Sequence, residues 1–237
     1  MNLLIIEDHH LISDTVARLG KQYHAHLTQV LRCQLGDRVV VGRLNGSIGE
    51  ATISAISEDA VELTLGVLDK PAPASLPLTL ILALPRPRML QRSLQTIATM
   101  GVQRLCLIQS QRVEKSYWQT PLLQAENVRQ QLITGLEQAK ATQLPEISFH
   151  RRLKPFIEDE LPAMCAGKSC LIAHPGNFAG CPRQPQTSTV LAVGPEGGFI
   201  PHELGLFQQA GFTPIQLGQR ILRVETAIPV LLSRLFY

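Results

Sequence analysis

The spacing of hydrophobic positions changes along the chain, from short alternating runs in the first 70 residues to a strand-and-helix rhythm afterwards. The early runs are rich in β-branched residues, and turn signals at Gly36-Asp37 and Asn45-Gly46 separate them. The expected strands are NLLII, DRVVVGRL, SIGEATISAI and AVELTLGV, and HAHLTQVLR interrupts them as a short helix. This pattern predicts a small β-rich domain of the barrel type.

A proline-rich segment ends this first region. The sequence DKPAPASLP, residues 69–77, holds three prolines and has no apolar periodicity, which is typical of a linker. The chain is therefore expected to form two domains, residues 1–70 and 71–237, with the linker at about 69–77.

After Pro77, apolar strands alternate with longer helical segments. Strands are expected at LTLILAL, RLCLIQ, EISFH, SCLIAH, TVLAVG and PIQLG, and helices at about 87–100, 125–139, 153–164, 201–210 and 225–236. Pro87 suits a first helical turn, and Gly101 suits the position just after a helix. The alternation predicts an α/β domain built on a mostly parallel sheet.

Composition limits the classes of function. The chain has 237 residues, 45% of them hydrophobic, so it can bury a real core. Its net charge of +3 and pI near 8.7 permit a nucleic-acid partner without requiring one. No apolar run reaches the length of a membrane span, and the amino terminus lacks the basic start of a signal peptide, so we expect an unexported protein with no membrane partner.

The five cysteines are odd in number and scattered, and they form no Cys-x-x-Cys pair, so we expect reduced thiols in the cytoplasm. Cys165, Cys170, His174 and Cys181 follow one another too irregularly for a standard zinc site, and no metal is predicted.

The strand TVLAV runs directly into Gly194-Pro195-Glu196-Gly197-Gly198. In open α/β sheets, ligands bind beyond the carboxyl ends of strands, where glycine lets the backbone approach a ligand closely. A tight turn from strand to helix would also recruit glycine and proline, so both interpretations stay open for this segment alone.

The second unusual segment is LGQRILRVETA, residues 217–227, where a strand end leads into the last helix. Thr226 or Glu225 is a candidate cap for that helix. Capping does not explain why Arg220 and Arg223 flank an apolar pair just before the helix begins.

Together with HLTQVLR at 26–32 and Gly36-Asp37, these two segments resemble the RsmE-like RNA methyltransferases of the SPOUT superfamily. The resemblance covers nearly the whole length and keeps the order of the motifs. It implies an amino-terminal PUA-like β-barrel that helps to hold RNA, and a carboxyl-terminal α/β domain with a deep trefoil knot. It also implies a homodimer that uses S-adenosylmethionine to methylate N3 of one uridine in the 16S RNA of the small ribosomal subunit. The apolar stripe of the last helix, Ile228, Leu231, Leu232 and Leu235, suits a dimer face or the core of one chain.

The resemblance assigns the cofactor pocket to Gly194, Pro195, Glu196, Gly197, Gly198, Leu217, Gly218, Ile221, Leu222, Arg223, Thr226 and Ala227, and His174 borders it. Backbone amides and apolar side chains suit an adenosine ligand. Methyl transfer to N3 needs loss of a proton, so Arg223 is expected to stabilise the developing anion. Glu196 is either a proton acceptor, a carboxylate that orients the cofactor, or an acid stabilised by a helix dipole.

Candidate RNA contacts are basic residues, of which Arg86 and Arg88 follow a strand on the presumed ligand side. The full set is Arg32, Arg86, Arg88, Arg112 and Lys115. Arg151-Arg152-Lys154 fits a solvated face as well, and Trp118 fits the core better than a base platform. The chain departs from the family pattern at Thr96, Thr99 and Ala141, which leaves open a paralogue that modifies another RNA, or an RNA-binding module without activity.

Overall fold

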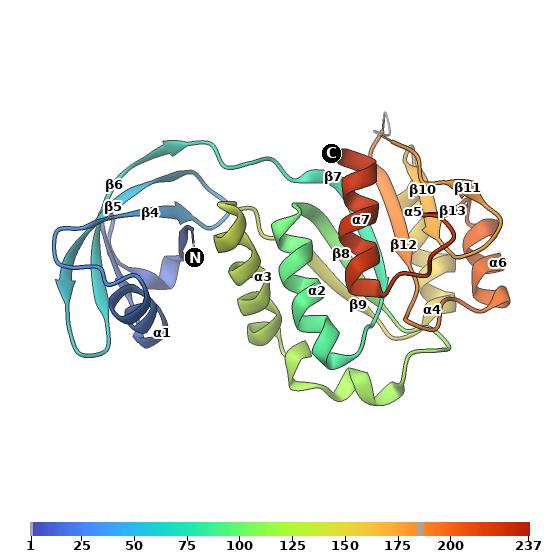
Figure 1. Cartoon of the computed structure of the whole chain (residues 1–237), viewed down its shortest axis with the longest axis horizontal. Coiled ribbons are helices and arrows are strands. Elements are labelled where there is room, and N and C mark those ends of the chain that lie inside the picture. The colour runs from blue at the N-terminus through green and yellow to red at the C-terminus, as the bar shows by residue number, and fades with distance from the viewer. Residues whose placement is uncertain (1, 184–186) are drawn as a thin grey trace. The chain divides into compact units, whose positions relative to one another are not determined.

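The computed structural model describes residues 2–183 and 187–237. The chain forms two compact units, one of Met1–Ala74 with Leu136–Leu144, the other of Ser75–Gly135 with Pro145–Tyr237. Figure 1 shows a β-rich unit in blue and a larger α/β unit in green to red.

The amino-terminal unit is built on a curled sheet, whose strands β4, β5 and β6 are labelled in Figure 1. The sheet has six strands in the order β1-β4-β5-β6-β3-β2. Its strands are β1 (Leu4–Ile6), β2 (Leu11–Ser13), β3 (Val16–Leu19), β4 (Arg38–Arg43), β5 (Ile48–Ile56) and β6 (Val61–Lys70). All neighbours are antiparallel except β1 and β4. β2 and β3 were not predicted, because these short segments form no continuous apolar run and are too short to show a period of two.

The core of this unit forms where the sheet meets a short helical segment. The segment comprises α1 (Lys21–Ala25) and the π-helical turn η2 (His26–Val30), and it ends near Arg32, whose φ of 57° is left-handed. Leu27 on this segment is fully buried against the sheet residues Leu19 and Leu63. The segment HLTQVLR therefore supplies a helical segment that packs into the core of this unit.

A second piece of chain completes this unit. Residues Leu136–Leu144, which include the end of helix α3 (Ala125–Ala139), belong to it although they lie far along the sequence. Thr142 Oγ1 donates a hydrogen bond of 2.6 Å to the carbonyl of Gly46, and the amide of Leu144 donates to Asn45 Oδ1 at 2.8 Å. The predicted division of the chain near residue 70 did not include this second segment in the amino-terminal unit.

The carboxyl-terminal unit is built on a seven-stranded sheet of order β11-β13-β10-β12-β7-β8-β9, in which every neighbouring pair is parallel. The strands are β7 (Leu76–Ala83), β8 (Val102–Ile108), β9 (Glu146–His150), β10 (Ser169–Ala173), β11 (Ala179–Gly180), β12 (Thr189–Val193) and β13 (Thr213–Gln216). The predicted parallel α/β class is thus confirmed. β12 lies near the centre, and all five of its residues are buried.

The helices of this unit are close to the predicted segments. They are α2 (Pro87–Thr99), α3, α4 (Leu153–Pro155) continued by η5 (Phe156–Glu160) and α5 (Leu161–Cys165), α6 (Pro201–Gln209) and α7 (Val224–Phe236), with short turns η3 (Lys115–Gln119) and η4 (Pro121–Leu123). Gly101 has a φ of 76° just beyond α2, as its predicted role requires.

One expectation for α7 is corrected, and one open alternative is decided. Arg223 is its N-cap residue and makes no side-chain capping bond, so neither Thr226 nor Glu225 caps the helix. The stripe Ile228, Leu231, Leu232 and Leu235 is fully buried within this one chain, where α7 packs against α2. The stripe is therefore core and not a free dimer face.

All five cysteines are free thiols. Within residues 2–183 and 187–237, no helix is long and apolar enough to cross a membrane.

Candidate functional site

The candidate site lies at the carboxyl ends of three neighbouring parallel strands. β12 leads into Gly194–Gly198, β10 leads into His174-Pro175-Gly176, and β13 leads into the loop before α7. Because the strands are parallel, these three loops emerge at one edge of the sheet, and together they line a cavity of about 380 Å³. The sheet topology thus brings Gly194–Gly198 and the loop at 217–222, which are separated in the sequence, to the same cavity.

The first loop needs glycine for conformation as well as for access. Gly198 has a φ of 71°, and its amide donates a hydrogen bond of 2.8 Å to the carbonyl of Pro195, which closes a tight turn. A Cβ on Gly194 would stand 3.1 Å from the amide nitrogen of Phe199. The structural interpretation of this segment is therefore confirmed, and its ligand-binding role stays a prediction.

The loop before α7 supplies the apolar wall. Gly218 has a φ of 127°, a conformation that a residue with a side chain rarely adopts. Ile221 lines the cavity with 81% of its surface exposed, and Leu222 lies beside it on the same wall. An exposed isoleucine that lines a cavity marks a surface a ligand could cover.

His174 contributes the third wall. Its Nδ1 atom is buried and has no hydrogen-bond partner among the described residues. Burial first, and the neighbouring charge of Arg112 second, lower the pKa of the His174 imidazole. Both effects favour the neutral form of the ring, whose buried Nδ1 makes no hydrogen bond within the described residues.

Most of the predicted cofactor residues line this cavity. From the first loop and its neighbour these are Gly194, Pro195, Glu196, Gly198 and His174. From the second loop these are Leu217, Gly218, Ile221, Leu222 and Ala227. Gly197, Arg223 and Thr226 are not among the lining residues. Gln219 and Arg220 also line the cavity but were not among the predicted cofactor residues, although both lie inside the quoted motif.

Gly197 faces a different neighbour. Its carbonyl accepts a hydrogen bond from the guanidinium of Arg112, and a Cβ placed on it would stand 3.0 Å from Arg112 Cδ. Arg112 thus ties the end of β8 to the glycine loop that follows β12.

The two candidate catalytic side chains differ in their anchoring. Glu196 is exposed at the cavity, and its Oε1 accepts a long bond of 3.4 Å from the amide of Arg86. Arg223 is also exposed, and its backbone carbonyl accepts from the amide of Ala227 at 2.7 Å, which starts α7. The backbone of Arg223 is fixed while its guanidinium stays available for a substrate.

The candidate RNA contacts are divided between the two units. Arg86, Arg88, Arg112 and Lys115 are exposed and follow the carboxyl ends of β7 and β8. Arg32 belongs to the other unit. Four of the five predicted cations therefore share the sheet edge that carries the cavity.

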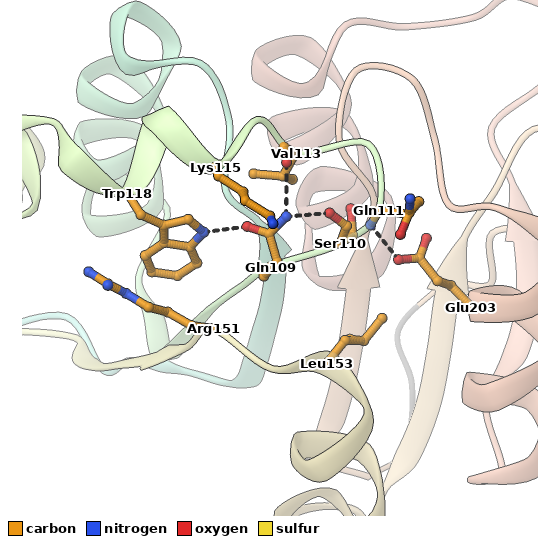
Figure 2. A pocket seen from close by; sticks show the side chains of 9 residues that line it. All are labelled: Gln109, Ser110, Gln111, Val113, Lys115, Trp118, Arg151, Leu153 and Glu203. Carbon is orange, nitrogen blue, oxygen red and sulfur yellow. Dashed lines mark hydrogen bonds between the residues drawn. The ribbon is translucent and has the colours of Figure 1, made fainter.

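A second cavity at this edge, of about 590 Å³, was not anticipated (Figure 2). It lies beyond β8 and β9 and includes Lys115 and Arg151. The polar run Gln109 to Arg112, directly after a buried strand, was the available signal. Within the described ranges no group of three His, Cys, Asp or Glu side chains is placed to hold a metal ion.

Comparison with known families agrees with this arrangement. Residues 72–236 match the model described as "RNA methyltransferase domain", and residues 20–66 match "RNA methyltransferase PUA domain". Ribosomal RNA small subunit methyltransferase E of Treponema pallidum is 28% identical over 232 residues, which is 96% of this chain and 87% of that protein. The Synechocystis protein of the same name is 27% identical over 98% of this chain and 76% of its own length.

Solved structures show the same fold. The methyltransferase E of Neisseria gonorrhoeae, solved with S-adenosyl methionine, superposes with a TM-score of 0.78 at 21% identity over 98% of this chain and 95% of that one. A Legionella pneumophila methyltransferase solved with the same cofactor gives 0.76 at 25% identity, over 98% and 96% of the two chains. With the family model spanning most of its length, the chain belongs to the RsmE family of RNA methyltransferases.

Proposed function

We propose that this protein uses S-adenosylmethionine to methylate N3 of a specific uridine in 16S ribosomal RNA. The observation that carries the proposal is the single cavity shared by the loops after β12, β10 and β13. The two relatives described above are named as methyltransferases of small-subunit ribosomal RNA. Two of the similar structures were solved with S-adenosylmethionine bound.

The cavity fits an adenosine-bearing cofactor. Its volume lies in the ordinary range for small-ligand sites, roughly 300–1,000 Å³. Buried Gly194 and Pro195 present backbone groups for the polar edge of a base, and Ile221 and Leu222 present apolar surface for its ring. The unpaired Nδ1 of His174 offers one further polar partner.

When bound, the cofactor supplies an electrophilic methyl group. The residues of this chain then have two tasks, to place the uridine and to manage the charge at N3 as its proton leaves. We assign the guanidinium of Arg223 to the developing negative charge and the carboxylate of Glu196 to the proton. Gly197 and Thr226 act indirectly. The carbonyl of Gly197 accepts a hydrogen bond from Arg112, and the amide of Thr226 donates to the carbonyl of Arg223 in the first turn of α7.

The wider setting follows from the family. We propose that the PUA-like unit, with Arg32, and the cations after β7 and β8 hold the RNA, that two copies form the active enzyme, and that the α/β unit carries a trefoil knot. The substrate is ribosomal RNA or the small ribosomal subunit, in the cytoplasm.

The departures from the family pattern have structural roles here. Thr99 Oγ1 donates to the carbonyl of Gly135 at 3.1 Å, and Ala141 is buried in the amino-terminal unit. Nothing in these contacts favours a different RNA substrate over 16S RNA.

Two measurements test the proposal. Calorimetry with S-adenosylmethionine should show one site per chain, and mass mapping of 16S RNA should show one N3-methyluridine that disappears when the gene is deleted. Restoring the gene should restore the modification. Absence of cofactor binding would exclude an enzyme, whereas normal binding with an unchanged 16S map would point to another RNA.

A further inference from the structure

The second cavity of the α/β unit contains a buried hydroxyl that the fold leaves unused. Ser110 is 2% exposed and follows β8, and its Oγ finds no hydrogen-bond partner within residues 2–183 and 187–237. A buried polar atom without a partner costs stability, so native proteins rarely keep one without a reason. Ser110 lines the cavity, where a ligand could supply the missing bond.

The wall around Ser110 is rigid because its other polar groups are satisfied. Gln109 Nε2 donates to the carbonyls of Ser110 at 2.6 Å and Val113 at 2.8 Å, and Gln109 Oε1 accepts from Trp118 Nε1 at 2.5 Å (Figure 2). Trp118 is only 8% exposed and serves as an anchor for this loop. The loop is thus fixed in place before any ligand arrives.

The buried acid of the cavity is also occupied. Glu203 Oε1 accepts from the amide of Gln111 at 2.6 Å, and its Oε2 accepts from the amide of Ile200 at 3.0 Å, at the start of α6. Two amide donors and the positive end of the helix dipole offset this negative charge. The charges left to act on a ligand are the exposed cations Lys115 and Arg151.

The cavity therefore has the cation Arg151 at one end, the cation Lys115 nearer its middle, and hydrogen-bonding groups at the other end. Figure 2 shows Arg151 beside Trp118, with the guanidinium carbon 5.3 Å from the ring centroid, and Gln111 and Glu203 at the opposite end. Lys115 and Ser110 lie between these ends. Cations suit a phosphate, and a hydroxyl with a carboxamide suits the edge of a base.

We infer that this cavity binds one unstacked nucleotide of the RNA substrate, apart from the uridine that is methylated. Lys115 and Arg151 take the phosphate, and Ser110 and the Gln111 carboxamide take the base edge. The inference rests on the proposed function. The position of the cavity agrees with this role. The loop that contains Ser110 and Gln111 also contains Arg112, which contacts Gly197 in the loop after β12.

The test measures binding of a labelled single-stranded RNA of about ten nucleotides to the full-length protein. Ser110→Ala should weaken binding about tenfold without changing its salt dependence, because no charge is lost. Lys115→Ala should weaken binding similarly and reduce the slope of log K against log salt by roughly 0.7. The matched control is Lys154→Ala, a neighbouring exposed lysine outside the cavity, which should bind as wild type.

Stability separates this role from a structural one. Ser110→Ala should melt at or above the wild-type temperature, because it removes an unsatisfied buried group. Wild-type RNA affinity in Ser110→Ala, or equal losses in Lys115→Ala and Lys154→Ala, would overturn the inference. Uridine monophosphate bound as tightly as the RNA would instead indicate a site for free nucleotides.

Failure here is distinguishable from failure of the proposed function. Calorimetry with S-adenosylmethionine should give the wild-type affinity for every variant, because none of them lines the first cavity. If cofactor binding and methylation are normal while the pocket variants bind RNA normally, only the nucleotide site is wrong.

Discussion

The carboxyl group of Glu137, near the end of α3, accepts a hydrogen bond from the phenol of Tyr23 inside the amino-terminal unit. Glu137 Oε1 also accepts from the amide of Ile5 at 3.2 Å, and the side chain is 2% exposed. Burial is the main cause that raises the pKa of Glu137 to about 7, and the two donors only partly oppose it. This pair ties the returning segment 136–144 to the first strand and first helix.

The first prediction concerns the pH dependence of stability. The pKa of Glu137 is higher in the folded chain, about 7, than its ordinary value of 4.5, so the folded state binds more protons between these values. Stability should therefore fall as pH rises from about 4.5 to 7, by about 3 kcal/mol. Glu137→Gln should abolish this fall, because the amide keeps an acceptor and cannot ionise.

Urea unfolding at pH 5 and pH 8, followed by a probe in the amino-terminal unit, measures this difference. Glu58→Gln removes an exposed carboxyl from the same unit and should leave the pH dependence intact. An unchanged pH dependence in Glu137→Gln would assign the effect to other groups.

The second prediction concerns the close approach of α2 and α3. A Cβ on Gly135 would collide with the backbone carbonyl of Gln95 and lie 2.9 Å from Ala98 Cβ. Gly135→Ala should therefore destabilise the α/β unit by about 1–3 kcal/mol, since backbone cannot move aside as a flexible side chain can. Gly205→Ala is the matched control, because a Cβ there meets nothing within 4 Å in α6, and it should stabilise by about 0.5–1 kcal/mol. Equal midpoints for both variants in thermal unfolding would contradict this account of the helix contact.

The third prediction concerns the exposed wall of the cofactor cavity. Ile221→Ala should weaken S-adenosylmethionine binding about tenfold, because about 1.4 kcal/mol of apolar burial on the ligand is lost. Its unfolding free energy should not change, since the side chain is 81% exposed without ligand. Val67→Ala, at a site 78% exposed in the other unit, should alter neither quantity. Calorimetry checks the affinity, and wild-type binding by Ile221→Ala would remove this residue from the site.

The fourth prediction separates binding from chemistry at Arg223. Because Arg223 does not line the cavity, Arg223→Ala should keep the cofactor affinity, and its turnover should fall about 100-fold if the guanidinium stabilises the reacting uridine. Arg223→Lys keeps the charge and should recover part of the rate. The measurement is methyl transfer to small-subunit RNA under saturating cofactor. A normal rate in Arg223→Ala would shift the electrostatic role to another cation, such as Arg220, which lines the cavity.

Local patterns in the sequence were enough for the longer helices of the α/β unit and for its strands other than β11. The helix over Pro87–Thr99 and the strand over Thr189–Val193 follow from apolar spacing, from a proline at the helix start and from a glycine after its end. Such patterns extend over only a few residues, so helices and strands of this kind can be recognised without knowledge of the fold. The short strands Leu11–Ser13 and Val16–Leu19 carry too few residues for any period, and only their pairing in the sheet defines them.

The sequence by itself determined the change of pattern near residue 70, the parallel α/β class, and the two motifs, Gly194–Gly198 and 217–222, at which we propose a ligand. Only the tertiary structure decided which residues share a surface. The parallel order β13-β10-β12 brings His174, Gly194 and Ile221 to one cavity, and the same edge brings Ser110, Lys115 and Arg151 to another. The tertiary structure also brings Glu137 into contact with Tyr23, which lies more than a hundred residues earlier in the chain. The physical reason is that packing and burial depend on contacts between distant segments, which no local pattern of side chains encodes.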